Sequence, residues 1–398
     1  EAGLRAAGEW EHGLCYVPLS GVREVEGIVP AIAQGLRLDF LADITVSPKE
    51  QVLNYLRGRQ VLLLLDSYEH LLEGAGLVAE ILAAAPGAKV LATSRAPLGL
   101  PGEVLYPLAG LAHSPEPGEG AAAKLFWTAA RRAGWEREPT PEDAAAVEGL
   151  CRRVGGLPLA VLLAATWMRT LSPAEIAAEL AQEAGRSLEL LTADWPGVPE
   201  RERSMRAVFD RSWELLSARE RAILAGLSVF RGGFTAHRAE AVTGATLRDL
   251  ARLVDRSLVM RRESGRYDLQ DLTREYAAAR LAETPEVEAA ARDRHAAHYA
   301  RALHEWEPLL MTGQETATLR EMEAEVGNIR AAWHWAVERG QAEWLRQGTY
   351  GLFQFYYRAY RWEEAEGLGG AAVQRLRGLV AERGREPGLL LALAECTK

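Results

Sequence analysis

The sequence has little cysteine and no long hydrophobic run. Its three cysteines, Cys15, Cys151 and Cys396, lie far apart, and no pair has the spacing of metal ligands. An odd and sparse set of this kind is typical of a reducing cytosol. No segment resembles a signal peptide or is long enough to cross a membrane. These absences argue against export and membrane anchoring and predict a cytoplasmic protein with no membrane partner.

An excess of basic residues is also missing. The chain has 46 Lys and Arg against 55 Asp and Glu, a net charge of −9, which argues against a large nucleic-acid-binding surface but allows a local basic face. The length of 398 residues predicts two to four domains. The chain opens on Glu1, without a methionine and within a helical pattern, and it ends just after another such pattern. This predicts a piece of a longer protein.

Five apolar residues followed by an acid form the most informative motif. The run Val61–Leu65 (VLLLL) precedes Asp66. An uninterrupted aliphatic run of this length predicts a strand buried on both faces, as in a parallel sheet. Asp66 then lies at the carboxyl end of the strand, where open α/β sheets bind their ligands. The structural alternative is an aspartate that only caps the following helix.

Strand and helix patterns alternate through residues 1–112. This alternation with short links predicts a doubly wound parallel sheet, preceded by the end of a helix at residues 1–12. The predicted strands are Leu14–Leu19, Val61–Leu65, Lys89–Arg95 and Val104–Leu108, and the predicted helices are Ile28–Leu36, Ser47–Leu56 and Tyr68–Ala85.

The rest of the chain is predicted to be mainly helical, so that the fold class is multidomain α/β plus mainly α. Residues 113–120 have the composition of a linker, and residues 121–195 predict a helical lid domain. Residues 201–285 predict a winged-helix domain, because helices are followed by two short strands around Ser264-Gly265. Residues 286–398, rich in Trp and Tyr, predict an incomplete α-solenoid of TPR-like repeats.

Two further motifs accompany Asp66. Thr93-Ser94-Arg95 ends the next predicted strand, where a hydroxyl and a guanidinium can reach a terminal phosphate. The alternative for Arg95 is a solvated arginine. Gly155-Gly156-Leu157-Pro158 allows a sharp turn into a helix, and the ring of Pro158 can pack on a flat purine. The alternative for this motif is a plain junction between helices.

Together the three motifs resemble the nucleotide-binding module of STAND or AP-ATPase (NB-ARC) signal-transduction proteins. The similarity is to bacterial ATPases attached to LuxR-type or antibiotic-regulator-type transcription factors. It rests on LLLLDSYEHLL at residues 62–72, VLATSRAPL at 90–98 and GLPLAVLLAA at 156–165. Order and spacing agree with the family as well, and the similarity weakens over the last hundred or so residues.

The resemblance implies ATP or ADP and Mg²⁺ as ligands and assigns roles to individual residues. Asp66 would hold Mg²⁺, Thr93 and Arg95 would meet the γ-phosphate, and Pro158 would contact adenine. Gln270 occupies the position of the family's histidine near the β-phosphate, and as an amide it can donate a hydrogen bond but carries no charge.

The chain departs from the family at two positions that bear on catalysis. Ser67 stands where a water-activating acid is usual, which leaves Glu69 as the nearby catalytic candidate or as a helix-capping residue. No Gly-Lys-Ser or Gly-Lys-Thr occurs, so the phosphate-cradling Walker A loop is lacking. We therefore expect weak or no nucleotide binding by this chain and, in a complete protein, at most slow hydrolysis.

The resemblance predicts a nucleotide-dependent switch that regulates an attached effector, most often transcription. An inducer or protein partner would bind the C-terminal helices, DNA would be bound only by a domain outside this chain, and activation could involve oligomerisation. The alternatives are a degenerate NTPase that serves as a scaffold, and direct DNA binding by the winged helix through Arg248, Arg252 and Arg256.

Two other groups of residues have structural interpretations that we favour. His295 and His298 could place two imidazoles on one helix face, yet no further ligand completes a metal site, which favours a packed or solvated pair. The aromatic residues between positions 333 and 362 could stack on a ligand, but core packing is the better interpretation.

Overall fold

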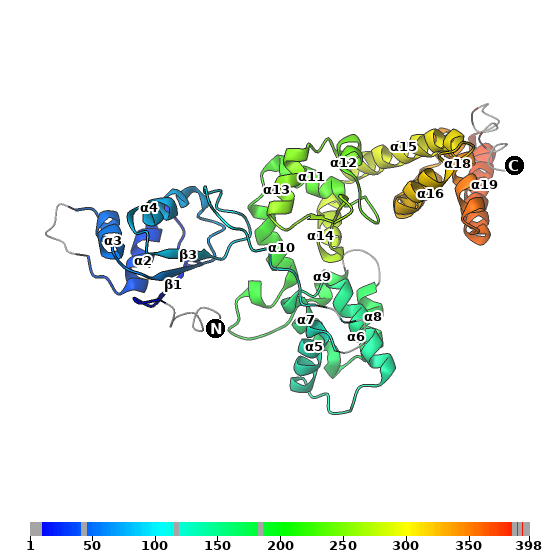
Figure 1. Cartoon of the computed structure of the whole chain (residues 1–398). Helices are drawn as coiled ribbons and strands as arrows, with labels where there is room; N and C mark the ends of the chain where they lie inside the picture. The colour runs from blue at the N-terminus through cyan, green and yellow to red at the C-terminus, as the bar shows by residue number, and fades with distance from the viewer. Residues whose placement is uncertain are drawn as a thin grey trace. The chain divides into compact units, whose positions relative to one another are not determined.

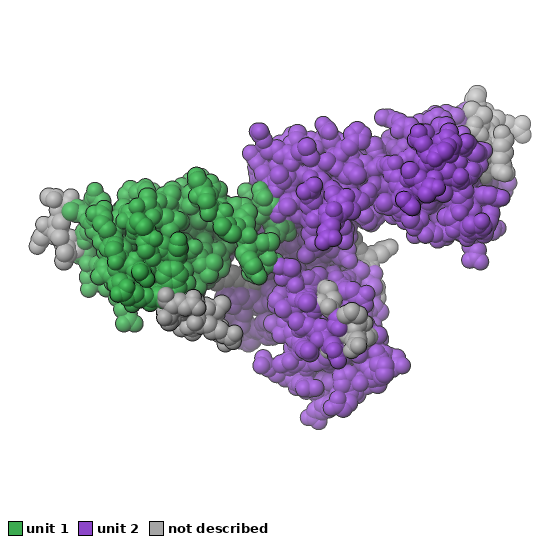
Figure 2. Space-filling model, in the orientation of Figure 1, with its two compact units in different colours: residues 1–108, 255–257 green, residues 109–254, 258–398 purple. Residues whose placement is uncertain are grey.

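The structure is a computed structural model that describes residues 10–40, 46–112, 114, 119–181, 186–383, 388 and 392. The chain divides into two compact units, residues 1–108 with 255–257 (unit 1) and residues 109–254 with 258–398 (unit 2), coloured separately in Figure 2. The predicted helix end at residues 1–12 and the predicted linker at 113–120 lie mostly outside the described residues. Among the residues described, no helix is both long and apolar enough to cross a membrane.

Within the described residues, unit 1 is built on a parallel three-stranded sheet (Figure 1). The strands run in the order β1 (Leu14–Pro18), β2 (Leu62–Asp66) and β3 (Lys89–Ala92), so the acid-tipped strand is central. This confirms the parallel sheet expected from the alternation. The helices of the unit are α2 (Ile28–Leu36), α3 (Pro48–Leu56) and α4 (Gly76–Ala84), with 3-10 turns η2 (Val25–Gly27) and η3 (Leu72–Gly74).

The helix expected from Tyr68 begins later than predicted. The backbone N–H of Tyr68 donates to the carbonyl of Thr93, beyond β3, and its buried hydroxyl donates to the carbonyl of Gly74. These bonds hold the chain in a turn after β2, and only η3 and then α4 have helical geometry. The predicted start of α3 is correct: Ser47 caps the helix in a capping box with Glu50.

The two faces of the sheet differ in burial. Cys15, Val17, Leu63 and Leu65 are buried in a core shared with α2, α3 and α4. On the other face, Tyr16 is 51% and Leu91 50% exposed, and Leu64 between them is partly exposed. The expectation of a strand buried on both faces holds only in part for β2: Leu62 is buried on the same face as Leu64, but the core that includes the helices lies on the other face.

The predicted strand Val104–Leu108 is not formed in the described structure. Val104, Tyr106 and Leu108 are highly exposed, and this segment has no regular secondary structure. Its apolar and aromatic residues have high β-propensity, but a strand also requires a neighbouring strand to which it can bond. The segment pairs with none of the described strands.

Unit 2 begins with a group of helices over residues 121–190. Phe126, Val147, Leu163 and Ile176 are buried in one core, which also includes Tyr276 from farther along the chain. Thr140 forms a capping box with Asp143 at the predicted start of the second helix. The helices are α5 (Ala121–Arg132), α6 (Pro141–Arg153), α7 (Pro158–Ala165), η4 (Thr166–Arg169), α8 (Pro173–Ala181) and α9 (Arg186–Leu190).

Helices followed by a β-hairpin come next, as predicted. β4 (Met260–Arg261) and β5 (Tyr267–Asp268) pair antiparallel around Ser264-Gly265. Phe234 forms a β-bridge with Tyr267, which ties the hairpin to the helices before it. The helices of this region are α10 (Met205–Glu214), α11 (Ala218–Leu227), α12 (Ala236–Thr243), α13 (Leu247–Asp255) and α14 (Asp271–Ala282), with η5 at Glu200–Glu202.

The C-terminal part is a run of helices with a core continuous with that of the preceding region. Trp333, Phe355 and Tyr356 are buried, and Trp333 Nε1 donates to the carbonyl of Leu368, as expected for core aromatics. Other aromatics, such as Tyr360, remain exposed. The helices are α15 (Pro285–Leu309), α16 (Glu315–Ala324), α17 (Val326–Arg339), α18 (Ala342–Arg358) and α19 (Trp362–Arg383) (Figure 1).

Candidate functional site

Asp66 ends the central strand of unit 1, and hydroxyl groups from both neighbouring strands hold its carboxylate. Thr93 Oγ1, just beyond β3, donates to Oδ1 at 2.6 Å. The hydroxyl of Tyr16, on β1, donates to Oδ2 at 2.8 Å. Two hydroxyl donors to one carboxylate fix its orientation. The predicted site residues Asp66 and Thr93 are thus brought together.

Thr93 also shapes the turn that follows Asp66. Its Oγ1 accepts a 2.9 Å hydrogen bond from the backbone N–H of Ser67, and its carbonyl accepts one from Tyr68. Ser67 has a φ of 67°, in the left-handed region that serine adopts rarely. The threonine therefore holds an unusual backbone conformation directly after the acid.

Tyr16 is a site residue that the sequence did not reveal. It lies opposite Leu64 in the sheet register, and its half-exposed ring carries the hydroxyl to Asp66. This hydrogen bond is the main cause that raises the pKa of Tyr16, with smaller contributions from burial and from the carboxylate charge. Only the strand register identifies the contact, because the two residues are far apart in sequence and share no motif.

Glu69 and Arg95 form a second, looser pair near the same edge. Arg95 Nε lies 3.9 Å from Glu69 Oε1, at the outer limit of an ion pair. Glu69 is only 8% exposed and lies in the turn before η3, not on the start of a helix as its capping interpretation required. An arginine in this pair could exchange its carboxylate partner for a phosphate, which binds a guanidinium in the same geometry.

The glycine turn that precedes Pro158 lies against Gln270 within unit 2. Gly155 and Gly156 have φ values of 64° and 63°, and Pro158 follows as the exposed first residue of α7. A Cβ added to Gly155 would lie 3.3 Å from the Gln270 amide. The glycine turn and the predicted β-phosphate contact therefore adjoin each other.

Gly156→Ala is expected to lower the free energy of unfolding of unit 2 by at least about 1–2 kcal/mol, the cost of placing a residue with a side chain in the left-handed region. The added Cβ would also lie 2.4 Å from the carbonyl oxygen of Leu111, whose N–H donates to the Gly156 carbonyl at 2.8 Å. Urea denaturation followed by circular dichroism measures the loss. Gly149→Ala is the matched control: it lies in α6 with nothing within 4 Å, so it should stabilise by roughly 0.5–1 kcal/mol. Equal effects of the two substitutions would contradict the prediction.

Asp66 has too few ligating side chains among the described residues around it to form a metal site from protein groups alone. Throughout the part of the chain that the structure describes, no group of three or more His, Cys, Asp or Glu side chains is placed to hold a metal ion. Mg²⁺ prefers one or two carboxylates completed by phosphate oxygens and water. Asp66 therefore fits an ion that arrives with a phosphate ligand, and the site does not fit a metal bound by protein alone.

The histidine pair is packed rather than metal-binding. His295 is 3% exposed and packs edge-on to Phe230, and His298 Nε2 lies 3.1 Å from Arg238 Nη1. An arginine donates to that nitrogen, so it is not available to a metal. This confirms the packed interpretation of the pair.

The basic face expected on α13 is incomplete. Arg248 and Arg252 are exposed on the helix, but the helix ends at Asp255, so Arg256 lies beyond it. Arg256 is one residue past the helix and only partly exposed, so the fully exposed arginines of the predicted face are Arg248 and Arg252.

Comparisons with known proteins identify mycobacterial relatives, whereas no protein-family model matches the chain. The chain is 33% identical over 349 residues to "Putative HTH-type transcriptional regulator Rv0890c" of Mycobacterium tuberculosis, an alignment that covers 85% of this chain and 38% of that protein. It is 33% identical to the protein of the same description, Mb0914c, in Mycobacterium bovis. The chain thus spans 38% of the length of these relatives.

A solved structure and a shorter relative complete the comparison. The structure is a STAND protein with a tetratricopeptide repeat sensor, PH0952 from Pyrococcus horikoshii. The two chains are 14% identical, and their alignment covers 93% of this chain and 61% of that chain. The TM-score of 0.20 is too low to establish a shared arrangement. The relative is "Uncharacterized protein Rv0894" of M. tuberculosis, 32% identical over 302 residues, which are 73% of this chain and 74% of that protein. By this similarity, the chain belongs to the same protein family as Rv0894.

Proposed function

We propose that the chain is the regulatory part of a nucleotide-dependent signal-transduction switch of the STAND type, which controls an attached effector in the cytoplasm. The observation that carries the proposal is the Asp66 carboxylate at the carboxyl end of the central strand, oriented by Thr93 and Tyr16. The relatives named as HTH-type transcriptional regulators, of which the chain spans 38%, support an effector that acts in transcription.

Each site residue has one role in this proposal. Bound Mg²⁺ would supply positive charge that offsets the charge of the nucleotide phosphates. Asp66 would hold the ion, with Thr93 fixing the carboxylate, and Arg95 would leave Glu69 to meet the γ-phosphate. The exposed ring of Pro158 would contact adenine, and the neutral amide of Gln270 would donate to the β-phosphate.

Slow hydrolysis follows from the residues after Asp66. Ser67 cannot act as a general base, and Glu69 is held near Arg95 and away from solvent. An uncharged Gln270 also gives the bound phosphates less stabilisation than a protonated histidine would. These features favour a switch that changes state by nucleotide exchange over a fast ATPase. Its inducer or protein partner would bind α15–α19, and its DNA-binding domain would lie outside this chain.

Asp66→Ala tests the nucleotide site. The sequence has no phosphate-cradling Gly-Lys-Ser or Gly-Lys-Thr, so calorimetry should show weak or no binding of ADP and ATP to this chain. In a form that carries such a loop ahead of Glu1, we expect Mg²⁺-dependent binding that Asp66→Ala weakens by about 10- to 100-fold. Asp39→Ala, at an exposed position of unit 1, is the control and should leave binding unchanged.

Two results would contradict the proposal: no nucleotide binding by the longer form, or Mg²⁺-dependent binding that survives Asp66→Ala. The first result would favour the second candidate function, a scaffold derived from an NTPase. The missing Gly-Lys-Ser or Gly-Lys-Thr is the observation that supports this candidate. A scaffold would bind its protein partner equally well with and without nucleotide, which distinguishes the two.

A further inference from the structure

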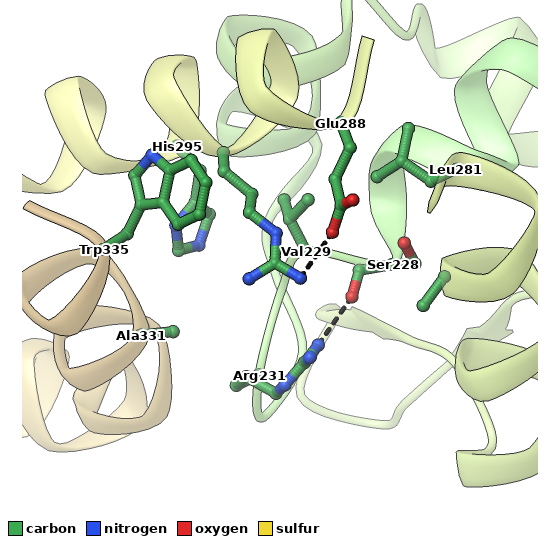
Figure 3. A pocket seen from close by; sticks show the side chains of 10 residues that line it. Ser228, Val229, Arg231, Leu281, Glu288, His295, Ala331 and Trp335 are labelled. Atoms are coloured by element: carbon green, nitrogen blue, oxygen red, sulfur yellow. Dashed lines mark hydrogen bonds and ion pairs between the residues drawn. The ribbon is translucent and has the colours of Figure 1, made fainter. Parts of the chain in front are cut away.

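A small cavity lies in unit 2 where the loop after α11 meets α14, α15 and α17 (Figure 3). Its volume is about 50 Å³, whereas one water requires roughly 10–15 Å³ of such space, so a small ion fits. None of the residues proposed to contact nucleotide lines it. The side chains that matter for a ligand are Ser228, Arg231, Arg292, His295, Ala331 and Trp335.

Arg231 brings a positive charge that lacks a carboxylate partner. Its Nη1 donates to the main-chain carbonyls of Ser228, at 2.5 Å, and Phe230, at 3.0 Å. Within the described part of the chain, no carboxylate lies within ion-pair distance of it. Burial lowers the pKa of Arg231, the nearby cations Arg274 and Arg292 lower it further, and the charge of Asp271 opposes them in part. An anion beside Arg231 would relieve this repulsion.

Arg292 is the second cation of the cavity, and it is only partly neutralised. Its Nη2 lies 2.7 Å from Glu288 Oε1, and its guanidinium lies 5.1 Å from the centre of the Trp335 ring. A guanidinium has five N–H donors, more than this one carboxylate uses. With Arg231, the cavity therefore has two positive charges against the single negative charge of Glu288.

His295 supplies an unpaired ring nitrogen. Its Nε2 is buried and has no hydrogen-bond partner in the described structure. Asn328 donates both amide hydrogens, to Gly233 O and to Glu325 Oε2, and its Oδ1 accepts from the Arg231 backbone. Asn328 is thus already bonded at both amide hydrogens and at Oδ1, so it can offer the His295 ring only a further lone pair on Oδ1. A ring that donates to this lone pair from Nδ1 is the tautomer whose Nε2 keeps its own lone pair, and this tautomer is part of the inference below.

We infer that this cavity binds a small oxyanion that also carries a hydroxyl group, of the hydrogenphosphate class. The oxyanion would accept from Arg231 and Arg292, and the hydroxyl would donate to Nε2 of His295. A buried acceptor without a donor costs free energy, and this ligand would satisfy it together with the excess positive charge. The anion would then bridge the loop after α11 and α15, elements that belong to different parts of unit 2.

Calorimetry of the 398-residue chain at pH 7 with inorganic phosphate, sulfate and chloride at equal ionic strength tests the inference. Phosphate should bind saturably. Sulfate has the same shape but carries no proton at this pH, so it cannot donate to His295. Its affinity should therefore be about tenfold lower than that of phosphate. Chloride should bind least. Equal binding of phosphate and sulfate would overturn the role of His295, and no saturable phosphate binding would overturn the site.

Variants locate the binding. Arg231→Gln should weaken the affinity for phosphate by about tenfold or more, because one charge-assisted hydrogen bond is lost. Ala331→Leu should fill the cavity and abolish binding while keeping every charge. Arg248→Gln, on an exposed face of α13, is the matched control. Arg95→Gln separates this site from the nucleotide site, since phosphate binding should survive it. Phosphate binding that Arg231→Gln and Ala331→Leu leave unchanged would place the anion elsewhere.

A direct signal and an ester probe complete the test. Phosphate should shift the imidazole nitrogen resonances of His295 in NMR spectra, even if one variant proves unstable, and unchanged resonances at saturation would contradict the site. Glycerol phosphate tests the source of the ligand: tighter binding than inorganic phosphate would identify a phosphate ester, and weaker binding would identify the free ion.

Discussion

Replacing Glu325 with alanine is expected to lower the free energy of unfolding by about 3–5 kcal/mol. The side chain is fully buried, and its carboxylate accepts from four groups of unit 2. Arg238 Nε lies at 3.0 Å, Arg266 Nη1 at 2.5 Å, the Tyr299 hydroxyl at 2.6 Å and Asn328 Nδ2 at 2.8 Å. Removing the carboxylate leaves buried donors unpaired, and Arg266 loses its ion-pair partner.

Glu323→Ala is the matched control for this prediction. Glu323 lies two residues away and also pairs with an arginine, Arg361, at 2.7 Å, but its side chain is 50% exposed. An exposed pair contributes about 0–1 kcal/mol, so the control should change stability little. Urea denaturation of both variants, followed by tryptophan fluorescence, measures the difference. A loss below about 1 kcal/mol for Glu325→Ala would show that the other groups compensate, as Glu321 does in part by its 2.8 Å pair with Arg238.

The local patterns of the sequence identified the elements but not their long-range contacts. The aliphatic run before Asp66 correctly predicted a strand of a parallel sheet, because burial and β-propensity act over a few neighbouring residues. The β-hairpin around Gly265 was predictable for the same reason. In contrast, the segment Val104–Leu108 has a strand pattern without a strand, because pairing depends on a neighbour that the pattern does not specify.

In the candidate site too, some contacts could be predicted from the sequence and others could not. Asp66 and Thr93 could be paired from the sequence, because parallel strands bring their carboxyl ends to one edge of the sheet. Tyr16 could not be found, since its contact with Asp66 depends on the register of β1 and β2. Asn328, which binds the Arg231 backbone, is 97 residues away in sequence. Polar contacts between distant helices leave no periodic pattern in the sequence, so they cannot be predicted from it.

Acidification from pH 7 to pH 5 is expected to lower the free energy of unfolding by about 2 kcal/mol for each of His295 and His298. Burial is the main cause that lowers the pKa of His295 from 6.5 to about 3 and that of His298 from 6.5 to about 4. For His298, the charges of Arg238, His237 and Arg301 act in the same direction and Glu325 opposes them. The pKa of His295 is raised by Asn328, and it is lowered by the charges of His298, Arg231 and Arg292.

The sign of this pH dependence follows from proton uptake. Between about pH 4 and 6.5 the unfolded chain binds a proton at each imidazole and the folded chain does not, so stability rises with pH in this window. The stabilisation is complete above the unfolded pKa and is lost as the pH falls toward the folded values. Carboxylates with a lowered pKa, such as Asp143 and Glu343, change the free energy of unfolding mainly below about pH 4, near the ordinary pKa of carboxyl groups. The change in stability between about pH 5 and 6.5 therefore reports on the histidines.

His298→Gln separates the two contributions. The glutamine carbonyl can accept from Arg238 as the imidazole Nε2 does, while the titrating group is removed. The slope of stability against pH between 5 and 6.5 should fall to about half of its original value, from about 2.7 to about 1.4 kcal/mol per pH unit at the acidic end. His304→Gln, on the same helix with a side chain 63% exposed, should leave the slope as it is. Equal slopes for the original chain and His298→Gln, measured by urea denaturation at a series of pH values, would contradict a buried neutral His298.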